Sequence, residues 1–282
     1  MDHSSIPLAG VIGRPVAHSR SPRLHGHWLR RLGLRGHYVP LDVGPDDLAE
    51  VLRALPRMGF VGANVTIPHK TAALQAAHNV TDRAALIGAA NTLTFRDGRI
   101  TADNTDGLGF LAALRAGAPD WRPEAGAAAV LGAGGAARAV LAALVEAGVP
   151  RILLSNRSRG RAERLRTDFG ARVEVVDWSR AASLFDDAVL AVNTTSLGMQ
   201  GAAPMRVPLG GFHPGLTVMD LVYAPLETPF LAAARTAGAT AVDGLGMLIH
   251  QAVPGFERWF GHRPPVDDET RRVLLGPPPP PR

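Results

Sequence analysis

One segment in the middle of the chain constrains its fold more than any other. Residues 127–131 are a short apolar run typical of a buried strand, and a turn with three glycines leads from it into an apolar helix. The spacing fits G-x-G-x-x-A, in which Gly132 makes the tight turn, Gly134 lets a pyrophosphate approach the backbone and Ala137 permits close helix packing. A plain structural turn can carry the same glycines, but here the strand and the helix that a dinucleotide-binding loop requires flank them. The segment therefore predicts a Rossmann-type unit that holds phosphates at the start of the helix.

The next expected strand, 151–155, predicts which dinucleotide binds. An NAD-binding chain normally places an acidic residue after this strand for the ribose 2′-hydroxyl, but this chain has Asn156-Arg157-Ser158 there. Arginine binds a 2′-phosphate through a planar pair of donors, whereas a carboxylate repels it. We therefore expect NADP rather than NAD, held by Arg157 and Arg161. The neighbouring arginines are expected on solvated helix faces: Arg159, Arg164 and Arg166.

Expected strands and helices alternate along the whole chain, which predicts an α/β fold with parallel sheets covered on both faces. Strands are expected at 8–12, 36–43, 61–67, 173–176, 188–192 and 216–219. Helices are expected from Pro22 onward, at 45–57, at 107–115 and at 229–237, with a short one near Ala181. A hairpin is expected at 91–102 around the Asp97-Gly98 turn. At 282 residues the chain is long enough for two domains.

Lys70 is the only lysine among the 30 Lys and Arg residues of the chain. A lysine ammonium can donate and recover a proton near neutral pH because burial or neighbouring charges move its pKa, whereas the arginine guanidinium stays charged. The residue therefore indicates acid–base chemistry, although an arginine-rich composition could leave a single surface lysine by chance. In the segment before it, period-two alternation places Asn64 and Thr66 on one face of a strand, and Pro68 turns the chain toward Lys70.

Other polar residues of the first half stand where a strand or a helix is expected to begin or end. Asp106 precedes the helix at 107–115 and could be its N-cap, and Ser21 before Pro22 is a second N-cap candidate. Ser19 has no such structural role. Neutral hydrogen-bonding groups of this kind suit a small polyol better than an apolar ligand, and they are offered by Ser19, Ser21, Asn64, Thr66 and Asn91.

The composition excludes several classes of site. The chain has no cysteine, which removes disulfides, thiolate nucleophiles and zinc–thiolate centres. No carboxylate joins the histidines of the first half at a spacing typical of ligands, so no metal is expected at His18, His25, His27 and His69. The net charge of +5 suits any anionic ligand. Because no basic run is interleaved with aromatic residues, no nucleic-acid partner is expected.

The sequence also predicts the character of the two ends of the chain and the absence of a membrane span. The first twenty residues lack the apolar core of a signal peptide, and no run of about 18 apolar residues predicts a membrane span. We therefore expect a soluble, cytoplasmic protein without a membrane partner. The stretch 276–281 is too rich in proline for a helix or a strand and is expected to be a frayed end.

Six motifs, which are distributed along most of the chain, resemble the shikimate dehydrogenase family in their residues and in their order. They are Ala17-His-Ser-Arg-Ser-Pro22, Gly62-Ala-Asn-Val-Thr-Ile-Pro-His-Lys70, Gly88-Ala-Ala-Asn-Thr92, Asp103-Asn-Thr-Asp-Gly107, Gly132-Ala-Gly-Gly135 and Asp243-Gly-Leu-Gly-Met-Leu248. The resemblance implies an NADP-dependent oxidoreductase acting on a CH–OH group, which reversibly reduces 3-dehydroshikimate to shikimate on the chorismate pathway to the aromatic amino acids.

The resemblance also implies the organisation of the chain. Two α/β domains are expected with a cleft between them. One is a substrate-binding domain with a mostly parallel sheet, formed by 1–107 plus 245–282, and the other is a Rossmann-type NADP-binding domain at 108–244. The partner would be the small-molecule substrate, and the protein would be a monomer or a homodimer.

Site residues are implied where the motifs match. Lys70 and Asp106 match the catalytic pair. Substrate contacts are matched by Ser19, Ser21, Asn64, Thr66, Asn91, Tyr223 and Gln251. The cofactor site is matched by Gly132, Ala133, Gly134, Gly135, Ala136, Asn156, Arg157, Ser158, Arg161, Thr195, Leu221, Gly244 and Met247. Three positions depart from the commonest family pattern, with Ser158 in place of threonine, Thr194 in place of alanine and Leu221 in place of methionine. Ser158 keeps its hydroxyl, and Leu221 bears on the affinity for the nicotinamide rather than on the reaction type.

In the implied mechanism the nicotinamide gives a hydride to the ring ketone while Lys70 protonates the ketone oxygen. Asp106 holds the ammonium and bonds the adjacent hydroxyl, and Ser19 and Ser21 bind the substrate carboxylate. A quinate/shikimate or aminoshikimate-type dehydrogenase would share this catalytic pair, although Arg157 argues against an NAD-preferring quinate enzyme. A chain of this kind could instead be a non-catalytic NADP-binding regulator or a nucleic-acid binder, and the pair of Lys70 and Asp106 argues against the regulator.

Overall fold

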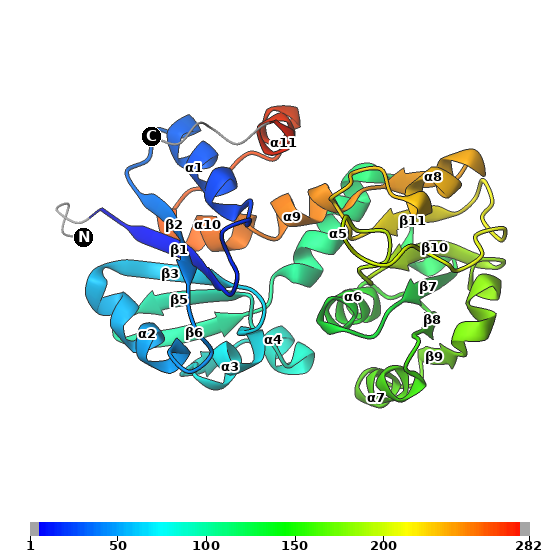
Figure 1. Cartoon of the computed structure of the whole chain (residues 1–282), viewed down its shortest axis with the longest axis horizontal. Helices are drawn as coiled ribbons and strands as arrows, with labels where there is room; N and C mark the ends of the chain where they lie inside the picture. The colour runs from blue at the N-terminus through cyan, green and yellow to red at the C-terminus, as the bar shows by residue number, and fades with distance from the viewer. Residues whose placement is uncertain (1–5, 277–282) are drawn as a thin grey trace. The chain divides into compact units, whose positions relative to one another are not determined.

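The computed structural model describes residues 6–276, so the proline-rich tail from 277 onward lies outside the described residues. The chain forms two compact units. Unit 1 contains the residues up to Thr105 together with those from Gln251 onward, and unit 2 contains Asp106–His250. Each unit is built on a six-stranded sheet (Figure 1). Within the described part of the chain, no helix has the length and apolarity needed to cross a membrane.

The sheet of unit 1 has the strand order β2-β1-β3-β5-β6-β4. Its strands are β1 (Leu8–Gly13), β2 (His37–Asp42), β3 (Phe60–Val65), β4 (Asn79–Val80), β5 (Thr92–Arg96) and β6 (Arg99–Asp103). β1 pairs in parallel with β2 and β3, β5 pairs antiparallel with β3 and β6, and β4 pairs in parallel with β6. Only β5 therefore runs against the others, and the expected mostly parallel sheet is confirmed.

The hairpin between β5 and β6 is confirmed as well. Asp97 has a φ of 51° and Gly98 a φ of 71°. This left-handed pair is what a two-residue type I′ turn requires, and aspartate followed by glycine adopts it readily.

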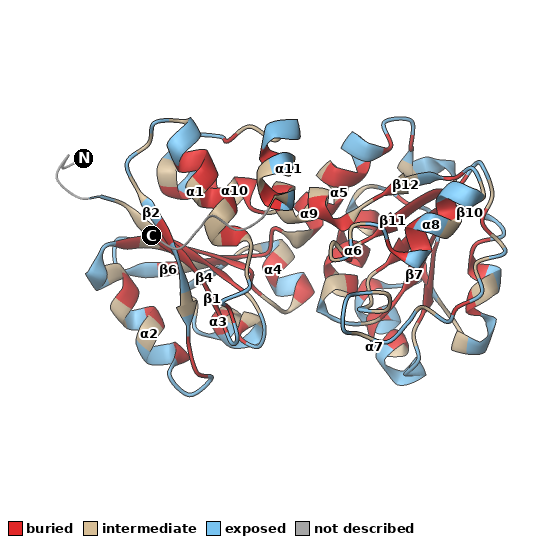
Figure 2. Ribbon diagram, turned by 45° about the horizontal axis from the view of Figure 1, so that its top comes forward, coloured by how far each residue is buried: buried red, intermediate tan, exposed pale blue. Residues whose placement is uncertain are grey.

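The helices of unit 1 cover both faces of its sheet (Figure 1). They are α1 (Ser21–Arg31), α2 (Leu48–Ala54) with its 3-10 continuation η1 (Leu55–Met58), α3 (Lys70–Gln75), α4 (Asp82–Ile87), α10 (Val253–Phe260) and α11 (Asp268–Leu275). The helix expected at 45–57 thus begins later, at Leu48, and tightens into a 3-10 turn at its end. α1 and α10 lie on one face and α2 and α3 on the other, and the buried strands run between them (Figure 2).

An aromatic cluster fills the face of this sheet beneath α1 and α10. The buried ring of His25 stacks on Tyr38 with 3.9 Å between ring centroids, and Trp28 and Phe256 pack edge-on to one another. Burial lowers the pKa of His25 to about 3, so this histidine is a neutral core residue. Trp259 of α10 donates its indole N–H to the carbonyl oxygen of Leu93 at 3.0 Å, which fixes the returning helix on the sheet.

The sheet of unit 2 has the order β12-β11-β10-β7-β8-β9, and all of its pairings are parallel. Its strands are β7 (Ala127–Leu131), β8 (Ile152–Ser155), β9 (Val173–Val176), β10 (Ala188–Asn193), β11 (Thr217–Asp220) and β12 (Thr240–Val242). Every residue of β7 is buried, as expected for a central strand covered on both faces. The expected Rossmann-type sheet is confirmed.

The helices of unit 2 are α5 (Asp106–Gly117), α6 (Gly135–Glu146), α7 (Arg159–Phe169), α8 (Pro229–Thr236) and α9 (Gly244–His250), with 3-10 turns η2 (Pro123–Ala125) and η3 (Trp178–Leu184). The short helix expected near Ala181 is thus a 3-10 helix. Gly107 lets α5 pack closely on α6, because a Cβ there would lie 3.0 Å from the carbonyl oxygen of Ala139. Gly148 follows α6 with a φ of 90°, so this glycine ends the helix as the sequence predicts.

Candidate active site

Three residues with amide side chains, all expected to bind the substrate, are joined by hydrogen bonds in unit 1. Asn64 donates its Nδ2 to the carbonyl oxygen of Asn91 at 3.1 Å, and Asn91 donates its Nδ2 to Oε1 of Gln251 at 3.2 Å. The sheet brings the first two together, because Asn64 in β3 faces Thr92 in β5. Gln251 comes from a segment 160 residues further along the chain. Its approach is a result of the fold that spacing in the sequence does not reveal.

Three further residues complete this network and were not predicted from the sequence. The hydroxyl of Tyr38 donates to Oδ1 of Asn64 at 2.7 Å. The hydroxyl of Thr92 donates to Oδ1 of Asn91 at 2.9 Å, and the backbone N–H of Thr105 donates to the same oxygen at 2.8 Å. Thr92 and Thr105 are both fully buried. A signal existed for these two, since they stand inside the family motifs directly beside Asn91 and Asp106.

The two serines near the start of α1 differ from expectation. Ser21 is the buried first residue of the helix rather than its N-cap, which is Arg20. Ser19, for which no structural role was expected, accepts a hydrogen bond from the backbone N–H of Ser21 at 3.3 Å. The N-cap interpretation of Ser21 was therefore wrong. It failed because Ser21 already belongs to the first helical turn, and Ser19 two residues earlier bonds the exposed N–H of that turn.

Lys70 is the half-buried first residue of α3. Its position follows from two contacts of the preceding segment. The backbone N–H of Thr66 donates to the carbonyl oxygen of Ile12 at 2.8 Å, immediately after β3 ends. Nε2 of the buried His69 ring lies 2.8 Å from the carbonyl oxygen of Val43, so this nitrogen carries the proton and donates. The chain before Lys70 is thus tied to β1 and to the end of β2.

Asp106 opens α5 and is half-buried, so it lies in the first turn instead of capping a helix that starts after it. The carboxylate three residues before it has a structural role. Asp103 is fully buried and accepts from Arg83 at 2.6 Å and from Arg258 at 2.7 Å. Burial alone would raise the pKa of Asp103, but the hydrogen bonds from Arg83, Thr81 and Arg258 outweigh it and lower the pKa to about 2. This ion pair anchors α4 and α10 to the end of β6.

The glycine-rich turn of unit 2 has the form that a phosphate-binding loop needs. Gly132 has a φ of 106°, in the left-handed region that favours glycine. A Cβ at Gly134 or Gly135 would meet no other atom within 4 Å, so the backbone there faces open space. Gly134 is the N-cap of α6 and offers no side-chain hydrogen bond to the first turn. The exposed N–H groups of a helix start are donors for an anion.

The residues after β8 are arranged around the same turn. Asn156 accepts the backbone N–H of Ala133 through Oδ1 at 3.2 Å and donates its Nδ2 to the carbonyl oxygen of Ser158 at 2.9 Å. Asn156 therefore joins the glycine-rich turn to the start of α7, where Ser158 is the N-cap. This geometry gives Asn156 a structural role beside its expected role at the cofactor.

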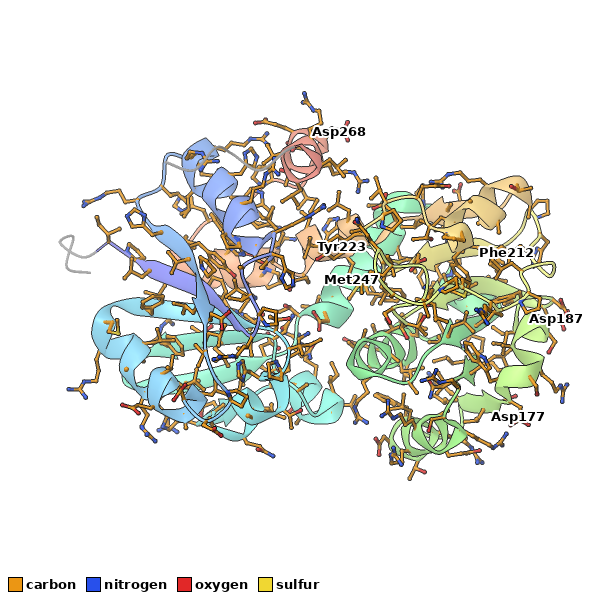
Figure 3. All side chains as sticks on the ribbon, viewed as in Figure 1. Asp177, Asp187, Phe212, Tyr223, Met247 and Asp268 are labelled. Carbon is orange, nitrogen blue, oxygen red and sulfur yellow. The ribbon has the colours of Figure 1, made fainter. Side chains whose placement is uncertain are left out.

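The arginines of this region fall into two groups. Arg151, Arg159 and Arg166 pair with carboxylates, and the partner of Arg159 is Asp177, labelled in Figure 3, together with Glu163. Arg157, Arg161 and Arg164 are exposed and form no ion pair with any residue that the structure describes. The two arginines expected to bind the 2′-phosphate are thus available to an external anion.

The remaining cofactor candidates lie on the loops after β10 and β11 and on α9, which follows β12. Asn193 accepts the hydroxyl of Thr195 at 2.7 Å and donates to the buried carboxyl of Asp220 at 2.9 Å.

A Cβ at Gly244 would overlap the carbonyl of Leu221, so this glycine lets the start of α9 pack against the loop after β11. Tyr223, on that loop, and Met247, on α9, are both half-buried and are labelled in Figure 3. Thr194, where alanine is usual in the family, donates its hydroxyl to the carbonyl oxygen of Leu131 at 2.7 Å.

The residues of unit 2 fit an NADP molecule. The glycine-rich turn gives a pyrophosphate access to the backbone, and the guanidinium groups of Arg157 and Arg161 suit a 2′-phosphate. The residues of unit 1 instead offer hydroxyls and amides, which suit the hydroxyl groups of a small polyol.

Comparison with known proteins assigns the family. A model of the shikimate dehydrogenase substrate binding domain matches residues 11–93, a model of shikimate / quinate 5-dehydrogenase matches 122–198, and a model of the shikimate 5′-dehydrogenase C-terminal domain matches 244–274. A shikimate dehydrogenase (NADP(+)) of Cereibacter sphaeroides is 65% identical over 275 residues, which cover 97% of this chain and 99% of that protein. The chain belongs to the shikimate dehydrogenase family.

Solved structures of the family share this architecture. The shikimate 5-dehydrogenase of Thermus thermophilus, in complex with NADP(H) and shikimate, is 39% identical with a TM-score of 0.84, and the match covers 96% of this chain and all of that one. A quinate dehydrogenase of Corynebacterium glutamicum, in complex with NAD, is 32% identical with a TM-score of 0.88, over 95% of this chain and 98% of that one. The family fold therefore accommodates both cofactors, and the choice between them depends on particular residues.

Proposed function

We propose that the chain is an NADP-dependent shikimate dehydrogenase, which reversibly reduces 3-dehydroshikimate to shikimate in the biosynthesis of aromatic amino acids. The observation that carries the proposal is the network of Asn64, Asn91 and Gln251 in unit 1, the same unit that presents Lys70. Neutral amides and hydroxyls bind ring hydroxyls, and a lysine supplies the proton that a ketone oxygen needs when it is reduced.

We propose that unit 1 binds the substrate. The hydroxyls of Ser19 and Ser21 bind its carboxylate, and Thr66 binds the ring together with the three amides. Tyr223 is a further residue proposed to contact the substrate. The proposed domains are 1–107 with 245–282 for the substrate and 108–244 for the cofactor, and they differ from the two units at 106–107 and 245–250.

The proposed cofactor site uses the glycine-rich turn, Gly132 through Ala136, for the pyrophosphate. Arg157 and Arg161 bind the 2′-phosphate, with Asn156 and Ser158 beside them. Thr195, Leu221, Gly244 and Met247 are proposed to line the nicotinamide end. The two arginines support NADP over NAD because only the former carries a phosphate at that position.

NADPH, when bound, supplies the hydride for the reduction of the ketone. Lys70 donates the proton to the ketone oxygen, and Asp106 is the second member of the proposed catalytic pair. A proton donor held at hydrogen-bonding distance avoids the entropic cost of an encounter in solution. In the oxidation of shikimate the neutral amine of Lys70 removes the hydroxyl proton.

Quinate is the second candidate substrate, since a quinate dehydrogenase shares the fold. That relative is described in complex with NAD, whereas Arg157 and Arg161 favour a 2′-phosphate in this chain. We further propose that the protein acts in the cytoplasm as a monomer or a homodimer, a choice that light scattering of the purified protein decides.

The test follows reduced cofactor at its near-ultraviolet absorbance with the purified chain. Shikimate and quinate are each supplied with NADP⁺ and with NAD⁺. The proposal requires shikimate with NADP⁺ to give the highest kcat/KM of the four combinations. Higher kcat/KM with quinate and NAD⁺ would identify a quinate dehydrogenase, and no turnover together with tight NADP⁺ binding would identify a non-catalytic NADP-binding protein.

A further inference from the structure

Two backbone groups determine which way the three amides of the substrate network face. The carbonyl oxygen of Asn91 can only accept, so the group of Asn64 that lies 3.1 Å from it is the Nδ2 donor. The backbone N–H of Thr105 can only donate, so the group of Asn91 that lies 2.8 Å from it is the Oδ1 acceptor. The Nδ2 of Asn91 then faces Gln251, which presents its Oε1 to it at 3.2 Å.

Two buried threonines reinforce this arrangement. The hydroxyl of Thr92 accepts from Nδ2 of Asn64 at 3.3 Å and donates to Oδ1 of Asn91 at 2.9 Å, so it bonds two of the amides at once. The hydroxyl of Thr105 donates to the carbonyl oxygen of Gln251 at 2.8 Å and so holds the backbone of the third. The two hydroxyl oxygens are 3.0 Å apart, and neither residue is exposed to solvent.

We propose that Thr92 and Thr105 are positioning residues that set the donor and acceptor polarity of the substrate site through Asn64, Asn91 and Gln251. Without the Thr92 hydroxyl, Oδ1 of Asn91 loses one of its donors and Nδ2 of Asn64 loses an acceptor. The backbone groups then hold Asn64 and Asn91 without the second contact that Thr92 supplies, so the turned orientations of these amides become more populated. A turned amide places an oxygen at a position where a ring hydroxyl needs an N–H donor. An unpaired polar group in a buried site is costly, so a hydroxylated ligand binds more weakly.

The inference rests on the proposed function, because it needs the three amides to bind ring hydroxyls. Shikimate oxidation by the wild-type protein is therefore measured first. If the wild-type chain does not oxidise shikimate, the proposed function fails before any variant is compared. If it does, the variants below test the positioning role separately.

Thr92→Val removes the hydroxyl and keeps the shape of the side chain. We expect it to raise the KM for shikimate about tenfold, as the loss of roughly one to two buried hydrogen bonds implies, and to leave the KM for NADP⁺ unchanged. Thr92→Ser keeps the hydroxyl and should retain the wild-type KM. Thr94→Val is the matched control, since Thr94 lies on the same strand and the same face, and its KM for shikimate should stay within about twofold of wild type.

A ligand without hydroxyls distinguishes positioning from general loosening of the site. Cyclohexene-1-carboxylate keeps the ring and the carboxylate of shikimate, so its inhibition constant should be the same for Thr92→Val and wild type. The proposal would be overturned if the KM of Thr92→Val for shikimate equalled that of Thr94→Val. It would also be overturned if Thr92→Val raised the KM for shikimate and the inhibition constant of cyclohexene-1-carboxylate by the same factor. If Thr92→Val does not fold, Thr105→Val carries the same comparison, with Thr105→Ser as its rescue.

Discussion

Asn193 donates its side-chain N–H to Asp220 over 2.9 Å, and this bond joins the carboxyl ends of the adjacent strands β10 and β11. The Asp220 carboxyl also accepts from the N–H of Val222 at 3.0 Å and from the hydroxyl of Thr228 at 2.7 Å. Burial raises the pKa of Asp220 to about 6, although all three hydrogen bonds act to lower it. Asn193, which accepts the Thr195 hydroxyl, is therefore hydrogen-bonded to a carboxyl with a raised pKa.

This raised pKa predicts a pH-dependent effect of Asp220→Asn. A carboxyl whose pKa is higher in the folded chain than in the unfolded chain contributes stability below about pH 4, and that contribution is lost as the pH rises through about 6. The neutral amide avoids the loss, so Asp220→Asn should be more stable than wild type at pH 8 by about 1–3 kcal/mol. The stability difference between Asp220→Asn and wild type should become smaller as the pH falls toward 5.

Urea unfolding at pH 5 and pH 8 measures this difference. Asp187→Asn is the control, because Asp187 is exposed on the same unit and should show no pH-dependent gain (Figure 3). An Asp220→Asn variant that is less stable than wild type at pH 8 would mean that the three hydrogen bonds outweigh the cost of burial.

Asp103→Ala is expected to be strongly destabilised, because it leaves Arg83 and Arg258 without the carboxylate that they share. Removing one partner of a buried ion pair costs about 3–5 kcal/mol, and the partial exposure of both arginines places the loss at the lower end. Since the folded pKa of Asp103 is lowered to about 2, its stabilisation is present above about pH 4 and is lost as the pH falls toward 2.

Urea unfolding of Asp103→Ala at pH 7, compared with the exposed control Asp46→Ala, measures this loss. A difference between the two variants of less than about 1 kcal/mol, the range of an exposed ion pair, would contradict a structural role for Asp103. Between about pH 4 and pH 2, wild type should lose stability faster than Asp103→Ala, because only wild type has this carboxylate to protonate.

Gly62→Ala should destabilise unit 1, because a Cβ at this position overlaps the indole of Trp259 and the carbonyl oxygen of Leu93. The methyl group would push α10 away from the sheet and lengthen the indole hydrogen bond to Leu93. Overpacking of this kind costs about 1–3 kcal/mol. Thermal unfolding followed by tryptophan fluorescence measures it, with Gly210→Ala as the control, since a Cβ there meets nothing within 4 Å. Equal melting temperatures for the two variants would refute the packing role.

Lys70→Arg keeps the charge but cannot release a proton near neutral pH. We expect kcat to fall by ~10²–10⁴-fold while NADP⁺ binding, measured by fluorescence titration, stays at the wild-type level. A variant that keeps more than half of the wild-type kcat would remove Lys70 from proton transfer. As the only lysine, Lys70 also allows a chemical check, because shikimate should protect this one side chain from an amine-selective reagent.

Replacing Arg157 and Arg161 by alanine should weaken NADP⁺ much more than NAD⁺. Charge-assisted bonds to a phosphate are worth about 1.5–3 kcal/mol each, so each replacement should raise the Kd for NADP⁺ by roughly 10- to 100-fold. Arg166→Ala is the matched control on α7, the helix that carries Arg161, since Arg166 already pairs with Glu163. An equal loss of affinity for both cofactors would contradict the assignment of the 2′-phosphate to these two arginines.

Local sequence was sufficient to predict the turns whose conformation depends on residues adjacent in the chain. The glycine spacing after 127–131 predicted the turn before α6, because backbone freedom and helix packing are properties of the residues at those positions. The Asp97-Gly98 dipeptide predicted the hairpin for the same reason. Where a cap depends on competition between neighbours, as at Ser21, local reasoning chose the wrong residue.

The sequence by itself determined the alternation of strands and helices, the glycine-rich turn before α6 and the Asp97-Gly98 hairpin. Only the tertiary structure decided that Gln251 meets Asn91, that Arg258 shares Asp103 with Arg83, and that Asp220 is buried deeply enough to raise its pKa. These contacts join residues far apart in the chain. The order of the strands in each sheet and the return of the C-terminal helices to unit 1 bring these residues together, and burial then shifts the pKa of their side chains. The spacing within a single motif determines neither the contacts nor the burial.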